Sequence, residues 1–254
     1  MSDANDVLEA LRALGFRAAR DSLRALLEQL SKARASPIET CEKLVALERR
    51  ERESHNLARR TRLATLGAHK ALDAFDWNHP KSIDRALYEE LLGVAFIDRS
   101  ENVLFRGQSG VGKTMLAQNL GLTALAKGYS VRFTTLAGVL ADLLKQESLP
   151  AYERRLRRYI HPELLIIDEL GYVPCDSRSA DLLYNIISRR HEKVSTVLTT
   201  NLAFKQWGTV FPGAACVAAL VDRFAQHLHV IDIDAESWRQ NKNDPPPQKP
   251  KRKR

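Results

Sequence analysis

The sequence predicts an α/β protein whose main domain is a mostly parallel β-sheet with helices on both faces, preceded by a small all-helical domain. Two observations lead to this prediction. Residues 5–66 read as helical throughout, and beyond Phe75 short apolar runs alternate with helical stretches. Five of the apolar runs are typical of strands, and they cover residues 103–105, 130–134, 164–167, 196–200 and 229–233.

The helical segment divides into three predicted helices. Residues 8–15 indicate a short first helix, and the leucines of residues 23–30 have helical spacing for a second. The third begins at Ser36-Pro37, because serine suits the N-cap and proline the first helical position. Its first half has an apolar stripe that includes Cys41, whereas its second half is polar and rich in arginine. We therefore expect the second half to be solvated or to lie against a charged partner.

Length and composition limit the class of protein. The chain has 254 residues, 44% of them hydrophobic, which suits one large domain with a smaller one attached. It contains no apolar run of the roughly 20 residues that a membrane span requires and no signal-peptide pattern, so we expect a cytoplasmic protein without a membrane partner. Cys41, Cys175 and Cys216 are widely spaced and form no metal-binding or disulfide pattern. We interpret all three as packing residues.

Basic residues are concentrated in three segments of a chain whose net charge is +8. Such clusters are typical of proteins that bind nucleic acids. The final segment is also rich in proline, which predicts a disordered tail. The clusters are Arg49, Arg50, Arg52, Arg59, Arg60 and Arg62; Arg154, Arg155, Arg157 and Arg158; and Lys249, Lys251, Arg252, Lys253 and Arg254.

A phosphate-binding loop follows the first predicted strand. Residues 107–114 read Gly-Gln-Ser-Gly-Val-Gly-Lys-Thr and match G-x-x-x-x-G-K-[ST] in the strand–loop–helix context that the motif requires. In such a loop the backbone amides bind phosphate oxygens, Lys113 reaches the β- and γ-phosphates, and Thr114 binds Mg²⁺. The sequence therefore predicts a nucleoside triphosphate site formed by Gly107, Gln108, Ser109, Gly110, Val111, Gly112, Lys113, Thr114 and Met115.

Two acidic residues end the third predicted strand. Asp168 occupies the position at which a carboxylate holds Mg²⁺, directly or through water. The adjacent Glu169 can orient and activate a water molecule for attack on the γ-phosphate, which is typical of hydrolases.

Two further groups complete the predicted catalytic set. The strand 196–200 should lie between the strands that carry the phosphate loop and Asp168, which would place Thr200 or Asn201 near the attacking water, although the same residues could form a simple turn. Arg223 follows on a predicted helix. It could stabilise charge on a phosphate, in its own chain or in a neighbouring subunit, or it could form a salt bridge with Asp181 or Asp222.

Together these segments resemble the IstB-like transposition helper ATPases, relatives of the helicase loader DnaC in the AAA+ superfamily. The resemblance covers nearly the whole chain. The phosphate loop alone is too widespread to choose a family. The segments that carry the resemblance are Leu8–Phe16, Leu44–Glu53, Ala58-Arg-Arg-Thr-Arg-Leu63, Leu72-Asp-Ala-Phe-Asp-Trp77, Leu165-Ile-Ile-Asp-Glu-Leu-Gly-Tyr172, Thr199-Thr-Asn201, Leu220-Val-Asp-Arg-Phe224 and Ser237-Trp-Arg239.

The resemblance implies an AAA+ ATPase with ATP and Mg²⁺ as cofactors. Such a protein forms a homo-oligomer on double-stranded DNA and assists a partner transposase. It implies that Asn201 is a sensor, that Arg223 is an arginine finger acting across a subunit interface, and that Phe75–Trp77 lie by the adenine. Arg239 would be a further phosphate-sensing or DNA-facing residue. The corresponding domains are a DNA- or partner-binding helical domain at 1–68, an ATPase domain at 69–240 and a tail at 241–254.

Three alternatives remain open at this point. A DnaC-like helicase loader would share the ATPase machinery but bind single-stranded DNA. A P-loop kinase for a small molecule would need an arginine-rich lid, for which residues 154–158 are candidates. A DNA-binding scaffold would use ATP only for assembly, and Glu169 argues against it.

Overall fold

The computed structural model describes residues 4–172, 175–213 and 215–238, and it divides into two compact units at residues 1–62 and 63–254. The division falls before the predicted domain boundary at residue 68. Ala64 and Leu66 are buried in the core of the second unit, and Gln118 Nε2 donates a hydrogen bond to Leu66 O at 2.8 Å. Residues 63–68 therefore pack with the sheet domain. Arg239 and the basic tail lie outside the described residues.

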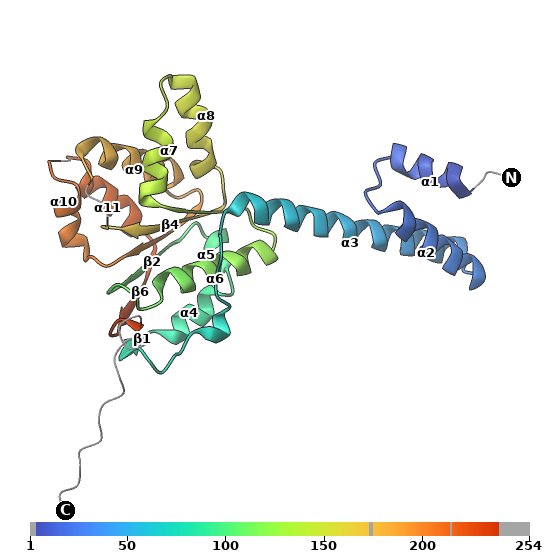
Figure 1. Cartoon of the computed structure of the whole chain (residues 1–254), viewed down its shortest axis with the longest axis horizontal. Helices are drawn as coiled ribbons and strands as arrows, with labels where there is room; N and C mark the ends of the chain where they lie inside the picture. The colour runs from blue at the N-terminus through green and yellow to red at the C-terminus, as the bar shows by residue number, and fades with distance from the viewer. Residues whose placement is uncertain (1–3, 173–174, 214, 239–254) are drawn as a thin grey trace, which may run out of the picture. The chain divides into compact units, whose positions relative to one another are not determined.

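The first unit contains α1 (Ala4–Ala13), α2 (Arg20–Lys32) and all but the last two residues of α3 (Pro37–Ala64) (Figure 1). Its small core joins Leu8, Ala18, Leu23 and Leu47. Ser36 caps α3 as predicted, because its Oγ accepts a hydrogen bond from the amide of Glu39 at 3.2 Å.

Glu48 on α3 connects this helix to the turn before α2. Its buried carboxylate accepts hydrogen bonds from the amides of Arg17 and Ala18 at 2.8–3.0 Å. Burial alone would raise the pKa of Glu48, but hydrogen bonds from Arg52 and these amides lower it below its ordinary value. The sequence analysis did not predict that a carboxylate of this polar helix is buried.

The second unit is built on a six-stranded sheet with the order β1-β6-β2-β5-β4-β3. Only β1 runs antiparallel to its neighbour, β6; the other pairs are parallel. The five predicted strands are confirmed, and β5 lies between β2 and β4 as expected. The strands are β1 (Ser82–Ile83), β2 (Asn102–Gly107), β3 (Val131–Thr135), β4 (Leu164–Leu170), β5 (Ser195–Thr200) and β6 (Leu228–Asp234).

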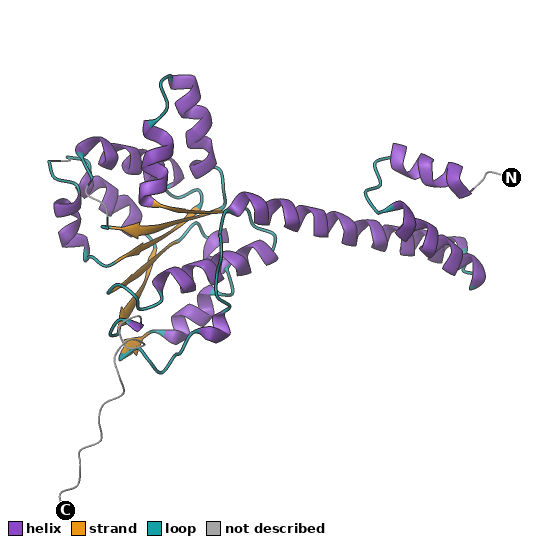
Figure 2. Cartoon of the chain, viewed as in Figure 1, coloured by secondary structure: helices purple, strands orange, loops and turns teal. Residues whose placement is uncertain are grey.

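Helices cover both faces of the sheet (Figure 2). Alternate strand residues point to opposite sides, so Val103 and Phe105 pack in one core while Leu104 packs in the other. The first core is covered by α4 (Arg85–Leu91), α5 (Ala95–Asp98) and α6 (Lys113–Ala126), and the second by α7 (Leu136–Leu144), α8 (Leu149–Ile160), α9 (Ser177–Arg190) and α11 (Val217–Ala225). The short elements η1 (Leu72–Ala74), η2 (Phe204–Gln206) and α10 (Trp207–Val210) complete the unit.

Because β2, β5 and β4 are parallel neighbours, their carboxyl ends meet at one edge of the sheet, where open α/β sheets bind ligands. The phosphate loop comes directly after β2 and the acidic pair lies near the end of β4, so both lie at this edge. None of the described helices is sufficiently long and apolar to span a membrane.

The cysteine interpretation holds for two of the three residues. Cys175 is buried and Cys216 packs partly against the same core, whereas Cys41 is exposed on α3. The packing role predicted for Cys41 is wrong, because the helix turns Leu44 and Leu47 toward the small core and leaves Cys41 in solvent.

Candidate nucleotide-binding site

The phosphate loop joins β2 to α6, and two of its glycines have conformations that other residues rarely adopt. Gly110 and Gly112 have φ angles of +81° and +99°. A Cβ at Gly112 would lie 2.6 Å from the Phe75 ring, and one at Gly110 would lie 2.4 Å from Ser237 Oγ. Both positions therefore favour glycine for backbone conformation, and Gly112 also requires it for space beside the Phe75 ring.

Lys113 is folded into the loop. Its side chain is buried, and its Nζ donates hydrogen bonds to the carbonyl oxygens of Gly107 and Gln108 at 2.7 and 2.6 Å. The ammonium is thus held beneath the loop at the start of α6, whose amino end favours anions. Gly107 and Gln108 therefore act by holding the Lys113 ammonium through their carbonyl oxygens. Residues 109–115 line the pocket itself.

A hydroxyl and a carboxylate form a set of hard oxygen donors beside the loop. Thr114 Oγ1 lies 2.9 and 3.1 Å from the two carboxylate oxygens of Asp168. Adjacent ligands of an octahedral Mg²⁺ at about 2.1 Å from the ion are about 3 Å apart. The spacing and the donor chemistry of Thr114 and Asp168 are therefore compatible with Mg²⁺, and the binding of the ion here stays a prediction.

Glu169 has an unusual backbone conformation. Its φ is +64°, in the left-handed region, and the pairing of β4 with β5 shifts register between Ile167 and Leu170. A left-handed non-glycine residue costs roughly 1–2 kcal/mol, and such positions often occur at functional sites. The irregularity leaves Asp168 buried while Glu169 is exposed at the pocket wall.

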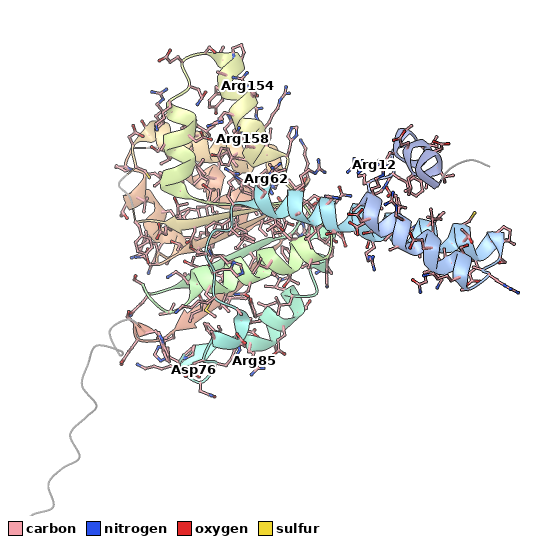
Figure 3. The ribbon with its side chains drawn as sticks, turned by 45° about the vertical axis from the view of Figure 1, so that its right-hand side comes forward. Arg12, Arg62, Asp76, Arg85, Arg154 and Arg158 are labelled. Carbon is pink, nitrogen blue, oxygen red and sulfur yellow. The ribbon has the colours of Figure 1, made fainter. Side chains whose placement is uncertain are left out.

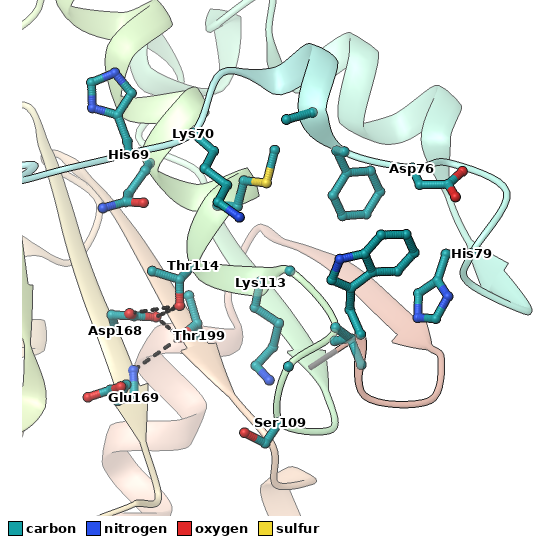
Figure 4. Close-up of a pocket in the computed structure, with 18 of the residues that line it drawn as sticks. His69, Lys70, Asp76, His79, Ser109, Lys113, Thr114, Asp168, Glu169 and Thr199 are labelled. Atoms are coloured by element: carbon teal, nitrogen blue, oxygen red, sulfur yellow. Dashed lines mark hydrogen bonds between the residues drawn. The ribbon is translucent and has the colours of Figure 1, made fainter. Parts of the chain in front are cut away.

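Thr199 connects the two acidic residues and was not predicted. Its Oγ1 donates a hydrogen bond to Asp168 Oδ1 and accepts one from the amide of Glu169 at 3.1 Å (Figure 4). The predicted alternatives at this strand end lie elsewhere. Thr200 is buried and donates to Leu170 O at 2.8 Å, and Asn201 is exposed and is not among the described residues that line the pocket. The strand was identified correctly, but its residue nearest the acidic pair is Thr199.

The pocket around the loop has a volume of about 480 Å³, enough for a nucleotide. Asp168 and Glu169 lie on one side of the loop, and Asp76 and His79 lie on the other (Figure 4). Phe75, which the resemblance places by the adenine, lines the pocket. Trp77 does not line it but packs against Phe75, with 4.7 Å between ring centroids.

Residues after β6 return to the phosphate loop, an arrangement that the sequence pattern did not reveal. The amide of Trp238 donates a hydrogen bond to Gly110 O at 3.2 Å, and its ring lies edge-on to His79 at 4.7 Å. His79 Nε2 also contacts Glu236 O at 2.9 Å. The end of the described chain thereby forms part of the pocket wall.

Arg223 does not line the pocket of its own chain in the described structure. Its guanidinium lies 5.0 Å from the centre of the Tyr184 ring and donates a hydrogen bond to Ser188 Oγ. The salt bridges considered for it with Asp181 or Asp222 are not among the ion pairs of the described residues.

The six arginines proposed for DNA binding on α3 differ in their surroundings. Arg49, Arg50, Arg59 and Arg62 are exposed, and Arg60 is half-buried. Arg52 instead contacts its own unit: its Nε lies 2.5 Å from Glu48 Oε1, and its Nη2 donates to Gly15 O at 3.0 Å. Arg52 is nevertheless exposed like most of the others, and the DNA contact expected of all six arginines stays a prediction.

The second arginine cluster lies on α8. Arg154, Arg157 and Arg158 are exposed, and Arg154 and Arg158 are labelled in Figure 3. Arg155 Nε instead forms an ion pair with Asp142 at 2.6 Å. None of the four lines the pocket in the described structure.

Comparison with known proteins agrees with this geometry. Residues 9–245 match the family described as IstB-like ATP binding protein. The chain is 34% identical over 215 residues to the protein assigned as ATP-binding in insertion sequence IS5376 of Geobacillus stearothermophilus, covering 85% of this chain and 86% of that protein. It is 36% identical to the corresponding protein of insertion sequence IS21 of Pseudomonas aeruginosa, covering 85% and 82%.

Solved structures show the fold alone. The structure of DnaI aligns with a TM-score of 0.53 at 21% identity and covers 66% of this chain and 92% of that one. The replication initiator DnaA bound to AMPPCP and single-stranded DNA aligns with a TM-score of 0.51 at 17% identity, covering 65% of this chain and about half, 52%, of DnaA. The second unit thus has the AAA+ P-loop fold that the resemblance implied.

Proposed function

The chain belongs to the family of IstB-like ATP binding proteins, and on that premise we propose that it hydrolyses ATP, assembles on double-stranded DNA and assists a transposase. The observation that supports hydrolysis most directly is the arrangement of Lys113, Asp168 and Glu169 around one pocket. The insertion sequences named for its relatives support the transposition role.

The proposed reaction transfers the γ-phosphoryl group of ATP to water. Lys113 would leave its two loop carbonyls to contact the β- and γ-phosphates. Thr114 and Asp168 would hold Mg²⁺, whose charge offsets that of the phosphates when it is bound. Glu169 would accept a proton from water as the water oxygen bonds to the γ-phosphorus and the bond to the β-phosphate oxygen breaks, giving ADP and phosphate.

We place the ATP site between subunits of a homo-oligomer. Arg223 lies outside the pocket of its own chain, so a neighbouring copy is the simplest source of the arginine that stabilises charge on the γ-phosphate. Asn201, which follows β5 and lies beside Gly171 at the end of β4, is the proposed sensor. Shared sites would make assembly depend on ATP, because the nucleotide stabilises the interface that completes its own pocket.

The exposed arginines of α3 are the proposed DNA contacts. Arg49, Arg50, Arg59 and Arg62 are exposed, so their guanidinium groups are available to phosphate oxygens. Contacts of this kind give affinity without sequence choice. Because its proposed partner is DNA, we also propose that the protein is located in the cytoplasm.

The alternative functions have weaker support. A helicase loader would share the fold, but the insertion sequences named for the relatives of this chain favour a role in transposition instead. A small-molecule kinase would need the α8 arginines as a lid, and none of them lines the pocket in the described structure.

The test is steady-state ATP hydrolysis with duplex DNA, with single-stranded DNA and without DNA. We expect stimulation chiefly by duplex. Stimulation by single strands alone would favour the loader. Indifference to both would remove the DNA-coupled function.

A further inference from the structure

Arg223 lies outside the pocket, where the helices α11 and α9 of the sheet domain pack together. On α11, Leu220 and Phe224 are buried in the same core as Leu183 and Ile187 of α9, which fixes the two helices against each other. Arg223 projects from this packed helix toward the half-buried face of α9.

Two α9 residues contact its guanidinium. Tyr184 and Ser188 are four residues apart and so share one helix face. The ring of Tyr184 lies 5.0 Å below the guanidinium carbon, within cation–π range, and Ser188 Oγ accepts a hydrogen bond.

The contact orients the cation without neutralising it. A carboxylate partner would compete with phosphate for the guanidinium, but no ion pair in the described part of the chain includes Arg223. A ring face and a hydroxyl restrict the many rotamers of arginine while its full charge remains available to an anion.

We propose that Tyr184 and Ser188 are positioning residues that hold Arg223 ready to contact the phosphate bound by a neighbouring subunit. The inference rests on the proposed function. It predicts that loss of the ring slows the chemical step, because the arginine must then be ordered during each turnover.

The test uses the full-length protein with Tyr184→Leu. We expect kcat for ATP hydrolysis to fall about two- to fivefold, the rate equivalent of a partly exposed cation–π contact, with KM for ATP unchanged. Tyr184→Phe keeps the ring face and should recover most of the rate. Tyr152→Leu is the matched control, since Tyr152 is a half-buried tyrosine that contacts α9 through Asn185 but not Arg223.

A double-substitution cycle separates positioning from general damage to the fold. In an Arg223→Ala background, Tyr184→Leu should have no further effect on kcat. An equal loss in both backgrounds would overturn the proposal, as would a normal or faster rate in Tyr184→Leu alone; a faster rate would mean that the ring holds the arginine away. Normal hydrolysis by Arg223→Ala would instead contradict the part of the proposed function that gives Arg223 a role at an ATP site shared between subunits.

Discussion

The hydroxyl of Thr199 contacts both acidic residues of the site, the carboxylate of Asp168 and the amide of Glu169. Thr199→Val keeps the shape of the side chain and removes these hydrogen bonds. We expect ATP hydrolysis to fall about tenfold or more, with a higher half-saturating Mg²⁺ concentration, because groups that orient metal-holding residues typically have effects of this size. A Mg²⁺ titration of ATPase activity measures both effects.

Thr199→Ser is the matched control, because it keeps the hydroxyl. It should retain Mg²⁺ dependence close to that of the unaltered protein. If Thr199→Val matched the unaltered protein as well, the hydroxyl would have no part in ordering the site.

Glu169 is the proposed acceptor of the water proton. Glu169→Gln keeps the size of the side chain but removes its basicity, so we expect ATP binding to persist while turnover falls at least a hundredfold. Equilibrium binding of a fluorescent ATP analogue and a phosphate-release assay on the same preparation distinguish binding from chemistry. Normal phosphate release would remove Glu169 from the catalytic role.

At the residue scale, sequence motifs identified groups that are defined by spacing along the chain. The phosphate loop and the Asp168-Glu169 pair are contiguous, so they could be found directly. Thr199 could not be preferred over its neighbours Thr200 and Asn201, because the choice depends on the register shift in β4 that places Glu169 in the left-handed region. The ion pair of Arg52 with Glu48 was also not foreseen, because Glu48 is buried by binding the amide of Arg17, 31 residues away.

At the element scale, Arg190 joins the end of α8, the end of α9 and the start of β5. Its side chain is 1% exposed. Its guanidinium donates to the carbonyls of Tyr159 and Pro162 at 2.9 and 2.8 Å, to Ser195 O, and to Thr196 Oγ1 at 2.9 Å. Burial lowers the pKa of Arg190 to about 9, which still leaves it charged at neutral pH.

Arg190→Leu should lower the free energy of unfolding by about 3 kcal/mol, because several buried acceptors lose their donors at once. Thermal or urea unfolding followed by circular dichroism measures the change. Arg189→Leu on the exposed side of the same helix end is the control and should change stability far less. Equal losses in the two proteins would contradict the structural role assigned to Arg190.

The exposed half of α3 is the element proposed to contact DNA. Replacing Arg49, Arg50, Arg59 and Arg62 by Ala should weaken duplex binding for every sequence tested and reduce the dependence of affinity on salt. Fluorescence anisotropy over a salt series measures both quantities. The matched variant replaces Arg154, Arg157 and Arg158 on α8; if that one alone lost affinity, the DNA contact would belong to α8.

The prediction of elements succeeded where a pattern extended over several residues. All five longer strands and the start of α3 followed from apolar runs and a capping signal. β1 was missed because two residues, Ser82 and Ile83, cannot show the alternation of apolar and polar side chains that is typical of a strand. They form a strand only by pairing with β6. The return of residues 235–238 to Gly110 is likewise set by tertiary contacts and not by local sequence.

At the scale of the whole molecule, Glu101 predicts how stability changes with pH. Its carboxylate accepts a hydrogen bond from Arg99 Nε at 2.8 Å. It also contacts Nε2 of His229, a residue of β6, at 2.8 Å. The hydrogen bond from Arg99 is the main cause that lowers the pKa of Glu101 from 4.5 to about 2, and the contact with His229 adds to it. The unfolded chain therefore takes up this proton at a higher pH than the folded protein does, so stability is lost as pH falls from about 4.5 toward 2.

We expect Glu101→Gln to be less stable than the unaltered protein at neutral pH, with a melting temperature that falls less steeply between about pH 5 and pH 3. Thermal melts at several pH values provide the comparison. The expectation fails if the two proteins show parallel melting curves across this range.

The position of Trp238 gives the molecule a built-in optical signal. The chain has three tryptophans: Trp207 is fully buried, Trp77 packs in the core, and Trp238 is 40% exposed at the wall of the pocket. A nucleotide that enters the pocket changes the solvent around the Trp238 indole, so its emission intensity and wavelength report occupancy. A protein in which the other two tryptophans are phenylalanine would make this emission a single-site signal, and binding and release of nucleotide could then be timed in a stopped-flow instrument without an attached dye.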